Sequence, residues 1–191
     1  MTALVAVLVA VLVVAAVLSL ALAGRSPAAR LAAFVTVGTL AFLGLLAVIG
    51  GTEAPPGGLV AKTLLVDLFV VAVLGGSPVT ATVLWLVDRG SRRDDMDDAS
   101  EVLRGGAWIG GFERAAVFAS LAAGWPEGLA VVLALKGLGR YSELRSSAAT
   151  PAGPPLTGGV AERFIIGTFA SVLWACACAA TYLSLLTRGL G

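Results

Sequence analysis

Apolar stretches long enough to cross a membrane recur along the chain, and short polar or Gly/Pro-rich segments separate them. A transmembrane helix needs about 20 predominantly apolar residues to span the hydrocarbon core. The stretches cover roughly 2–23, 31–49, 62–87, 105–123, 127–143 and 160–186. This pattern predicts an all-α membrane fold, a polytopic bundle of six transmembrane helices that forms a single domain over residues 1–191.

The first stretch has a second interpretation as a secretory signal peptide, because the small residues at 21–24 resemble a cleavage site. A signal peptide, however, begins with a charged segment and has an apolar core of about 7–15 residues. Residues 2–23 carry no charge and exceed that length. We therefore interpret them as a spanning helix.

The third stretch, 62–87, contains the sequence Gly75-Gly76-Ser77-Pro78. Pro78 has no amide hydrogen to donate to the carbonyl of Leu74, and its ring clashes there. Such a break is tolerated in a membrane where neighbouring protein satisfies the freed backbone groups. The third helix is therefore predicted to be kinked at Gly75–Pro78.

Basic residues are distributed unevenly among the connections. Helices one to three are expected within 1–87, a polar loop at 88–104, and helices four to six within 105–191. The connections on one side of the predicted bundle carry Arg25, Arg30, Arg89, Arg92, Arg93, Arg104, Arg140, Arg145 and Arg163. The other side, with both termini, carries only Lys62 and Arg188. Because basic residues of short loops stay in the cytoplasm, we expect the 88–104 loop to be cytoplasmic and both termini to lie outside.

The composition favours lipid as the solvent of this chain. Hydrophobic residues make up 58% of it and charged residues 13%, against about 45–50% and about 25% in a soluble domain. The net charge of +1 argues against nucleic-acid binding. The two cysteines, Cys176 and Cys178, lie within an apolar stretch, and we interpret them as small buried hydrophobes.

Sequence motifs for catalysis are missing. The chain has no histidine, and it contains no nucleophile elbow, P-loop, dinucleotide fingerprint, zincin helix or EF-hand loop. A membrane enzyme that acts on lipids is weakly supported, because the available carboxylates form no evident acid–base pair; these are Glu113, Glu127, Glu143 and Glu162. We expect no catalytic residues, no metal and no cofactor, and a non-enzymatic protein.

Three charged residues lie inside apolar stretches: Glu113 and Arg114 in the fourth, and Lys136 in the fifth. A charge in the membrane costs about 2.5–3.5 kcal/mol on insertion scales, so each needs a partner or a wet cavity. From the helical rise, Glu113 lies about 12 Å and Lys136 about 10 Å below the cytoplasmic face. The two helices are antiparallel and joined by a tight turn, so we predict a Glu113–Lys136 ion pair.

Small and polar residues recur at helical spacing on the last three helices, which we expect to converge in the cytoplasmic leaflet. The predicted packing positions are Gly106, Gly110 and Gly167. The predicted binding cluster comprises Glu113, Arg114, Lys136, Arg140, Thr168 and Ser171. In one interpretation the cluster is a structural clamp. In the other, Arg114, Lys136 and Arg140 form a basic pocket for an anionic lipid headgroup or a small anion.

Asp67 is a further charge within an apolar stretch, near the outer end of the third helix. Snorkelling to the interface explains it. A carboxylate on a helix that is broken at Pro78 also resembles the coupling-ion site of a transporter. A small transporter or permease is therefore the alternative function.

Three segments in the second half of the chain carry distinctive patterns. Trp108-Ile109-Gly110 with Glu113-Arg114 reads W-I-G-x-x-E-R, Lys136 to Tyr141 reads K-x-x-x-R-[FY], and Ile166 to Ser171 reads I-G-T-x-x-S. Together these segments, over roughly 105–175, resemble a family of uncharacterised bacterial integral membrane proteins. The resemblance implies a multi-pass protein of the bacterial plasma membrane and no particular reaction. From the charged cluster and the apolar stretches, we expect the bilayer, an anionic lipid or a partner membrane protein as contacts.

Overall fold

The computed structural model describes residues 2–21, 27–49, 57–87, 104–148 and 158–188. Within these ranges the chain forms six α-helices and no strand, so the predicted all-helical fold is confirmed. The helices are α1 Thr2–Ala21, α2 Pro27–Ile49, α3 Gly58–Val87, α4 Arg104–Ala122, α5 Glu127–Ala148 and α6 Gly158–Arg188. Of the predicted polar loop at 88–104, only Arg104 lies in the described ranges, as the first residue of α4.

Among the residues that the structure describes, three helical segments are long and apolar enough to cross a membrane: α2, α3 and the Arg163–Thr187 part of α6. A shorter apolar segment, Val7–Leu18, lies in α1. Large apolar side chains cover much of the outer surface, among them Leu59 at 80% and Trp108 at 75% exposure. Such a surface is unfavourable in water and compatible with a lipid environment. The number of membrane crossings stays a prediction.

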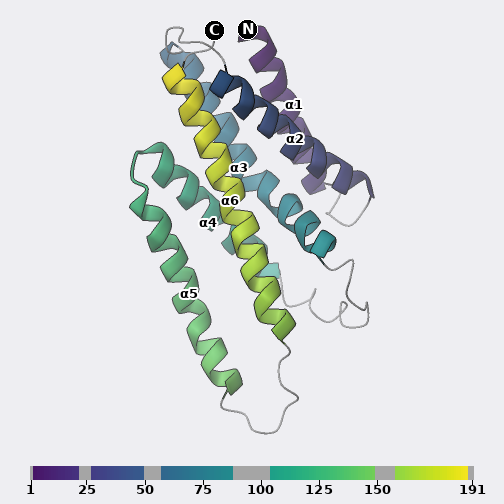
Figure 1. Cartoon of the computed structure of the whole chain (residues 1–191), viewed down its shortest axis with the longest axis vertical. Coiled ribbons are helices and arrows are strands. Elements are labelled where there is room, and N and C mark those ends of the chain that lie inside the picture. The colour runs from purple at the N-terminus through teal and green to yellow at the C-terminus, as the bar shows by residue number, and fades with distance from the viewer. Residues whose placement is uncertain (1, 22–26, 50–56, 88–103, 149–157, 189–191) are drawn as a thin grey trace.

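The long helices α3 and α6 share the most extensive helix–helix contact and form the centre of the bundle. The pair α1 and α2 packs on one side of this centre, and α4 packs against both α3 and α6 on another (Figure 1). The peripheral helix α5 makes its main contact with α4. A charged residue on α4 can therefore reach three other helices.

The apolar core fills the space between α1, α2, α3 and α6. Its largest fully buried side chains include Leu12, Leu43, Leu68 and Leu185, one from each of these helices. Phe118 of α4 joins the core edge-on to the ring of Phe69, with ring centroids 5.8 Å apart. In a bilayer such side chains exchange lipid contacts for protein contacts, so close packing holds this core together. Cys178 is also fully buried, as an apolar packing residue would be.

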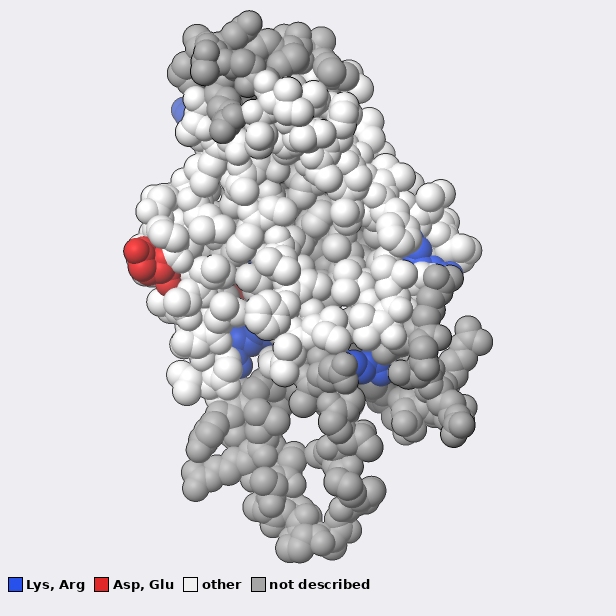
Figure 2. Space-filling model, in the orientation of Figure 1, with Lys and Arg blue, Asp and Glu red and all other residues white. Residues whose placement is uncertain are grey.

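The start of α1 and the end of α6 lie at the same end of the bundle (Figure 1). Figure 2 shows a broad uncharged surface, with a single blue patch near that end and the other blue atoms lower down. At the opposite end, the Arg30 guanidinium lies over the ring of Trp85, 4.2 Å from its centroid, and ties the start of α2 to the end of α3. This arrangement is compatible with the predicted arginine asymmetry, while the sidedness itself stays a prediction.

α3 continues without interruption through Pro78, which is buried. The predicted break is therefore not a break in secondary structure, and the predicted kink stays untested. A proline lacks the amide hydrogen that would bond to the carbonyl one turn earlier. One turn later, Thr82 Oγ1 donates to the carbonyl of Pro78 at 2.8 Å, the usual bond of a threonine hydroxyl to the preceding turn of its helix.

A tight turn at Gly124-Trp125-Pro126 joins α4 to α5, as predicted for the connection between the fourth and fifth helices. Gly124 has a positive φ of 74°, which side chains disfavour. The Trp125 amide donates to the carbonyl of Ser120 at 2.8 Å, as expected where a helix ends. A Cβ on Gly128 would collide with Ser120 and Trp125, so the two helices approach closely here. The short turn brings residues at matching depth on α4 and α5 into register.

Candidate functional site

Glu113 and Lys136 form an ion pair between α4 and α5, as predicted from their depths. Lys136 Nζ donates to Glu113 Oε2, and both side chains are largely buried, with 20% and 13% exposure. The ammonium group also lies 5.5 Å from the ring centroid of Phe164 on α6. Opposite charges attract each other more strongly in a low-dielectric site than in water. The ion pair therefore links α5 to α4 and places the ammonium group of Lys136 near α6.

Arg114, the next residue of α4, reaches other helices because successive residues of a helix diverge in direction. Its side chain is 5% exposed. Nε and Nη2 both donate to the backbone carbonyl of Val73 on α3, at 3.0 and 2.7 Å. Nη2 also donates to Ser77 Oγ at 2.9 Å, and Nη1 donates to Ser171 Oγ on α6 at 3.2 Å. One guanidinium thus joins α4 to both central helices.

Two glycines make room for this guanidinium. A Cβ on Gly76 would overlap the Arg114 side chain, at 2.5 Å from Nε and 3.0 Å from Cζ. A Cβ on Gly110 would stand 3.3 Å from Nη1. Gly110 was predicted as a helix-packing position. The next residue, Gly111, faces α3, because a Cβ on Gly111 would lie 3.9 Å from Val73 Cγ1. The glycine at 110 therefore provides space for a side chain of its own helix.

Gly75 permits a second close approach, on a different face of α3. A Cβ there would lie 3.2 Å from Trp174 Cζ2 and 3.4 Å from the Cβ of Ala16. Trp174 Nε1 donates to the backbone carbonyl of Val71 at 3.2 Å, so the buried indole is anchored to the same helix. Because neither glycine has a side chain, Trp174 of α6 and Arg114 of α4 can both approach the α3 backbone closely.

The polar positions predicted on α6 face this centre. Ser171 binds Arg114, as described above, and Gly167 faces α3, with its Cβ position 3.7 Å from Thr80 Cγ2. The hydroxyl oxygens of Thr168 and Thr80 are buried and have no hydrogen-bond partner among the described residues. Of the other predicted residues, Gly106 and Arg140 belong to helices α4 and α5, but their surroundings lie outside the described part.

The site separates two cations that the sequence grouped in one basic pocket. Lys136 binds the carboxylate of Glu113, whereas Arg114 turns to carbonyl and hydroxyl acceptors on α3 and α6. Within the described ranges, Arg114 has no carboxylate in ion-pair contact. The cluster of Glu113, Arg114 and Lys136 therefore carries a net charge of +1 when all three side chains are ionised.

Asp67 lies on α3 and is partly buried, with no hydrogen bond or ion pair to another described residue. Its distance from Pro78 along the helix axis is about 16 Å, from a rise of about 1.5 Å per residue. Asp67 and Pro78 thus share a helix but not a site. No three His, Cys, Asp or Glu side chains in the described segments gather as metal ligands.

Sequence reasoning did not identify Val73, Ser77 and Trp174 as part of this centre. Every residue type has a backbone carbonyl, so the role of Val73 as a hydrogen-bond acceptor could not be predicted from its identity. The sequence did contain an indication of this contact, because Ser77 follows two glycines inside an apolar helix. A group of small residues in a membrane helix indicates that another part of the protein approaches closely.

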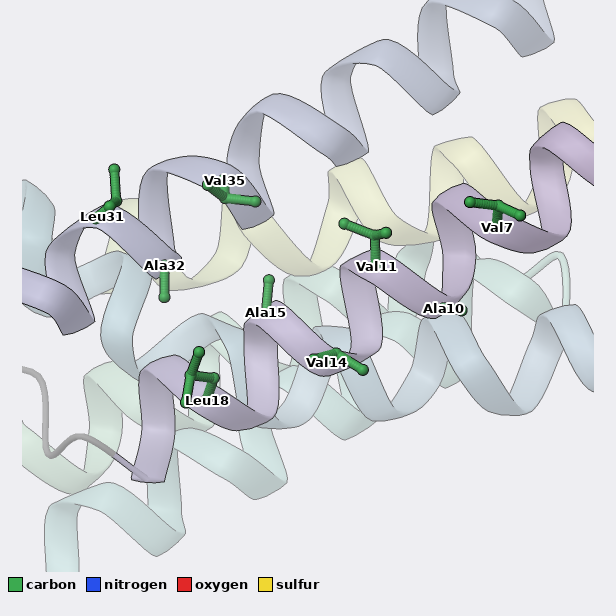
Figure 3. A pocket seen from close by; sticks show the side chains of 9 residues that line it. All are labelled: Val7, Ala10, Val11, Val14, Ala15, Leu18, Leu31, Ala32 and Val35. Carbon is green, nitrogen blue, oxygen red and sulfur yellow. The ribbon is translucent and has the colours of Figure 1, made fainter.

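A separate apolar groove lies between α1 and α2, with a volume of about 510 Å³. Figure 3 shows side chains of both helices along it, from Val7 at one end to Leu18 and Leu31 at the other. All of its lining residues are Ala, Val or Leu. The groove therefore offers no polar group that would orient a ligand.

Comparisons with known proteins find no relative for this chain: no protein family, no curated protein and no solved structure matches it. The resemblance to the bacterial membrane family accordingly stays a prediction. Any function has to be argued from the geometry of the site itself.

Proposed function

We propose that this chain is a non-enzymatic, multi-pass integral membrane protein whose six helices each cross the bilayer. Adjacent charges on α4 act as a structural clamp for α3, α5 and α6. The resemblance noted in the sequence favours the bacterial plasma membrane as its location, with both termini outside. The arginine-rich end then faces the cytoplasm, where anionic lipid headgroups or a partner membrane protein are the expected contacts.

The observation that carries the proposal is the division of partners between Glu113 and Arg114. Glu113 binds Lys136 of α5, and Arg114 binds Val73 of α3 and Ser171 of α6. In a membrane, helix association lacks the usual hydrophobic driving force, so packing and polar contacts carry it. Two charges placed side by side on one helix supply such contacts to three neighbours.

Replacement of Glu113 by Gln tests the clamp. The variant leaves Lys136 without its counter-charge in a largely buried site, and we expect a clear fall in the thermal unfolding temperature of the protein in mild detergent. Glu127→Gln is the matched control, because Glu127 is exposed at the start of α5. Native mass spectrometry of both variants then compares the lipids or proteins that co-purify. Equal stability and equal co-purifying species in the two variants would exclude the clamp.

A small transporter is the second candidate, and the partly buried Asp67 without a described partner favours it. The packing around Gly75 and Gly76 favours the clamp, because Trp174 and Arg114 fill the space that a moving hinge needs. Flux into proteoliposomes distinguishes the two functions. Gradient-driven uptake that is abolished by Asp67→Asn and Pro78→Ala supports transport, whereas no flux over a broad solute panel supports the clamp alone.

A further inference from the structure

The guanidinium of Arg114 donates hydrogen bonds only to neutral groups within the described part of the bundle. Its acceptors are one carbonyl and two serine hydroxyls, and the neighbouring carboxylate of Glu113 is committed to Lys136. Moving an isolated cation into a low-dielectric interior is costly, and burial is normally offset by an opposite charge. The centre of the bundle therefore has a chemical reason to hold an anion.

Donors for such an anion remain next to the guanidinium. Nη1 makes a single described hydrogen bond, to Ser171, and a guanidinium Nη carries a further N–H. Thr80 and Thr168 each bury a hydroxyl without a described partner. Other threonines of this protein, such as Thr82 and Thr181, bond to the carbonyl one turn earlier. The hydroxyls of Thr80 and Thr168 are therefore exceptions that call for a ligand.

The two unpartnered threonines lie on the same helix faces as the serines that bind Arg114. Thr80 follows Ser77 by one turn on α3, and Thr168 precedes Ser171 by one turn on α6. Each threonine is displaced from its serine by about 4.5 Å along the helix axis. The helices run in opposite directions, so both displacements lead toward the end at which α3 stops and α6 starts (Figure 1). A Cβ on Gly167, the residue before Thr168, would stand 3.7 Å from Thr80 Cγ2, so α3 and α6 pack against each other at this level.

We propose that Arg114, Thr80 and Thr168 bind one small anion between α3, α4 and α6. The ligand chemistry is a single negative charge that accepts hydrogen bonds from Nη1 and the two threonine hydroxyls. The proposal deepens the clamp and rests on the membrane location proposed above. Both a free halide and the phosphate oxygen of a lipid headgroup have this chemistry, and the experiment below separates them.

Thermal unfolding in delipidated detergent solution tests the anion site. The unfolding temperature is measured while chloride replaces gluconate. The ionic strength is kept constant, so the screening of charges does not change during the titration. We expect a saturable rise with chloride, since a ligand that binds only the folded state stabilises it by mass action. A second titration, without chloride, compares micelles that contain phosphatidylglycerol with micelles that contain phosphatidylcholine.

The decisive variant is the double replacement Thr80→Val and Thr168→Val, which removes both hydroxyls at nearly constant volume. We expect its apparent affinity for the anion to fall about tenfold or more, as the loss of hydrogen bonds to a charged group implies. The single replacements serve if the double variant does not fold. Thr82→Val and Thr181→Val are matched controls on the same two helices, and their anion response should equal that of the wild type.

A chloride response that the double variant weakens assigns a free anion. A response to phosphatidylglycerol alone, again weakened in the double variant, assigns a lipid headgroup. The proposal is overturned if neither titration stabilises the wild type, or if the threonine variants respond as the wild type does. In that case water satisfies the two hydroxyls. Loss of stability in Glu113→Gln at every anion concentration tests the clamp separately, because Glu113 does not contact the proposed anion.

Discussion

One edge of the Arg114 guanidinium binds the backbone carbonyl of Val73, through Nε at 3.0 Å and Nη2 at 2.7 Å. The contact joins α4 to α3 just before the turn that contains Pro78. Proline disturbs hydrogen bonding in the preceding turn of a helix, and in membranes neighbouring groups make up for it. The arginine thus supports α3 at a weak point of that helix.

Loss of the Arg114 side chain should destabilise the protein strongly. Arg114→Met removes the charged donor that binds the Val73 carbonyl and the hydroxyls of Ser77 and Ser171, and we expect a loss of about 2–4 kcal/mol in the free energy of unfolding. Arg114→Lys keeps the charge but not the planar fork, and should recover only part of this loss. Unfolding in mild detergent with a denaturant series measures both variants. If Arg114→Met unfolds at the same denaturant concentration as the wild type, the contacts described here do not stabilise the bundle.

A methyl group at Gly76 should be among the most damaging small changes. Gly76→Ala places a Cβ inside the volume of the Arg114 side chain, so we expect a loss of about 1–3 kcal/mol, as found for overpacked cores. Gly38→Ala on α2 is the matched control, because no atom lies within 4 Å of its Cβ position. That control should be neutral or stabilising by up to about 1 kcal/mol, from the higher helix propensity of alanine. Thermal unfolding of the two variants decides the matter, and a reversed order of stability would refute the close approach.

The two serines that bind Arg114 should act through it. Ser77→Ala and Ser171→Ala each remove one hydrogen bond to a charged group, at an expected cost of about 1–2 kcal/mol. In the background of Arg114→Met both serine replacements should have little further effect, because residues that share one interaction are not additive. Unfolding free energies of the singles and doubles test this. Additive losses would show that the serines stabilise the protein by another route.

The sidedness of the bundle is open to a direct test. A reporter that works only outside the cytoplasm should be active when it is fused after Arg188. A reporter that works only in the cytoplasm should be active when it is fused within 88–103. This result follows from the arginine asymmetry and an even number of crossings. Cytoplasmic activity of the C-terminal fusion would mean that the number of crossings or the orientation is wrong.

The sequence predicted the Glu113–Lys136 pair because its determinants are local. Two apolar stretches joined by Gly124-Trp125-Pro126 must lie side by side, and the helical rise then sets the depth of each charge. Helix positions were also predictable to within a few residues, since apolar length fixes them. The structure extends α5 to Ala148 and α6 back to Gly158. Polar residues can prolong a helix beyond its apolar part, so hydropathy alone does not show where it ends.

The partners of Arg114 were not predictable in the same way. They lie 41 and 57 residues away along the chain, and one is a backbone carbonyl. Arg114 was grouped with Lys136 and Arg140 because of its charge alone. In the structure its side chain leaves α4 in a different direction from that of Glu113 and contacts α3 and α6. The glycines at 75 and 76 were predicted as part of a kink with Pro78. The structure shows a further role, because both leave room for side chains of other helices, Trp174 and Arg114.

The most direct test of the account is a double-mutant cycle on the ion pair that joins α4 to α5. Unfolding free energies are measured for the wild type, Glu113→Gln, Lys136→Met and the double variant in the same detergent. We expect each single variant to lose about 1–3 kcal/mol, because it leaves one largely buried charge unpaired, and the double variant to lose less than the sum. A coupling energy of about 1 kcal/mol or more agrees with the clamp. Strictly additive effects would contradict it, because the two charges would then stabilise the bundle independently of each other.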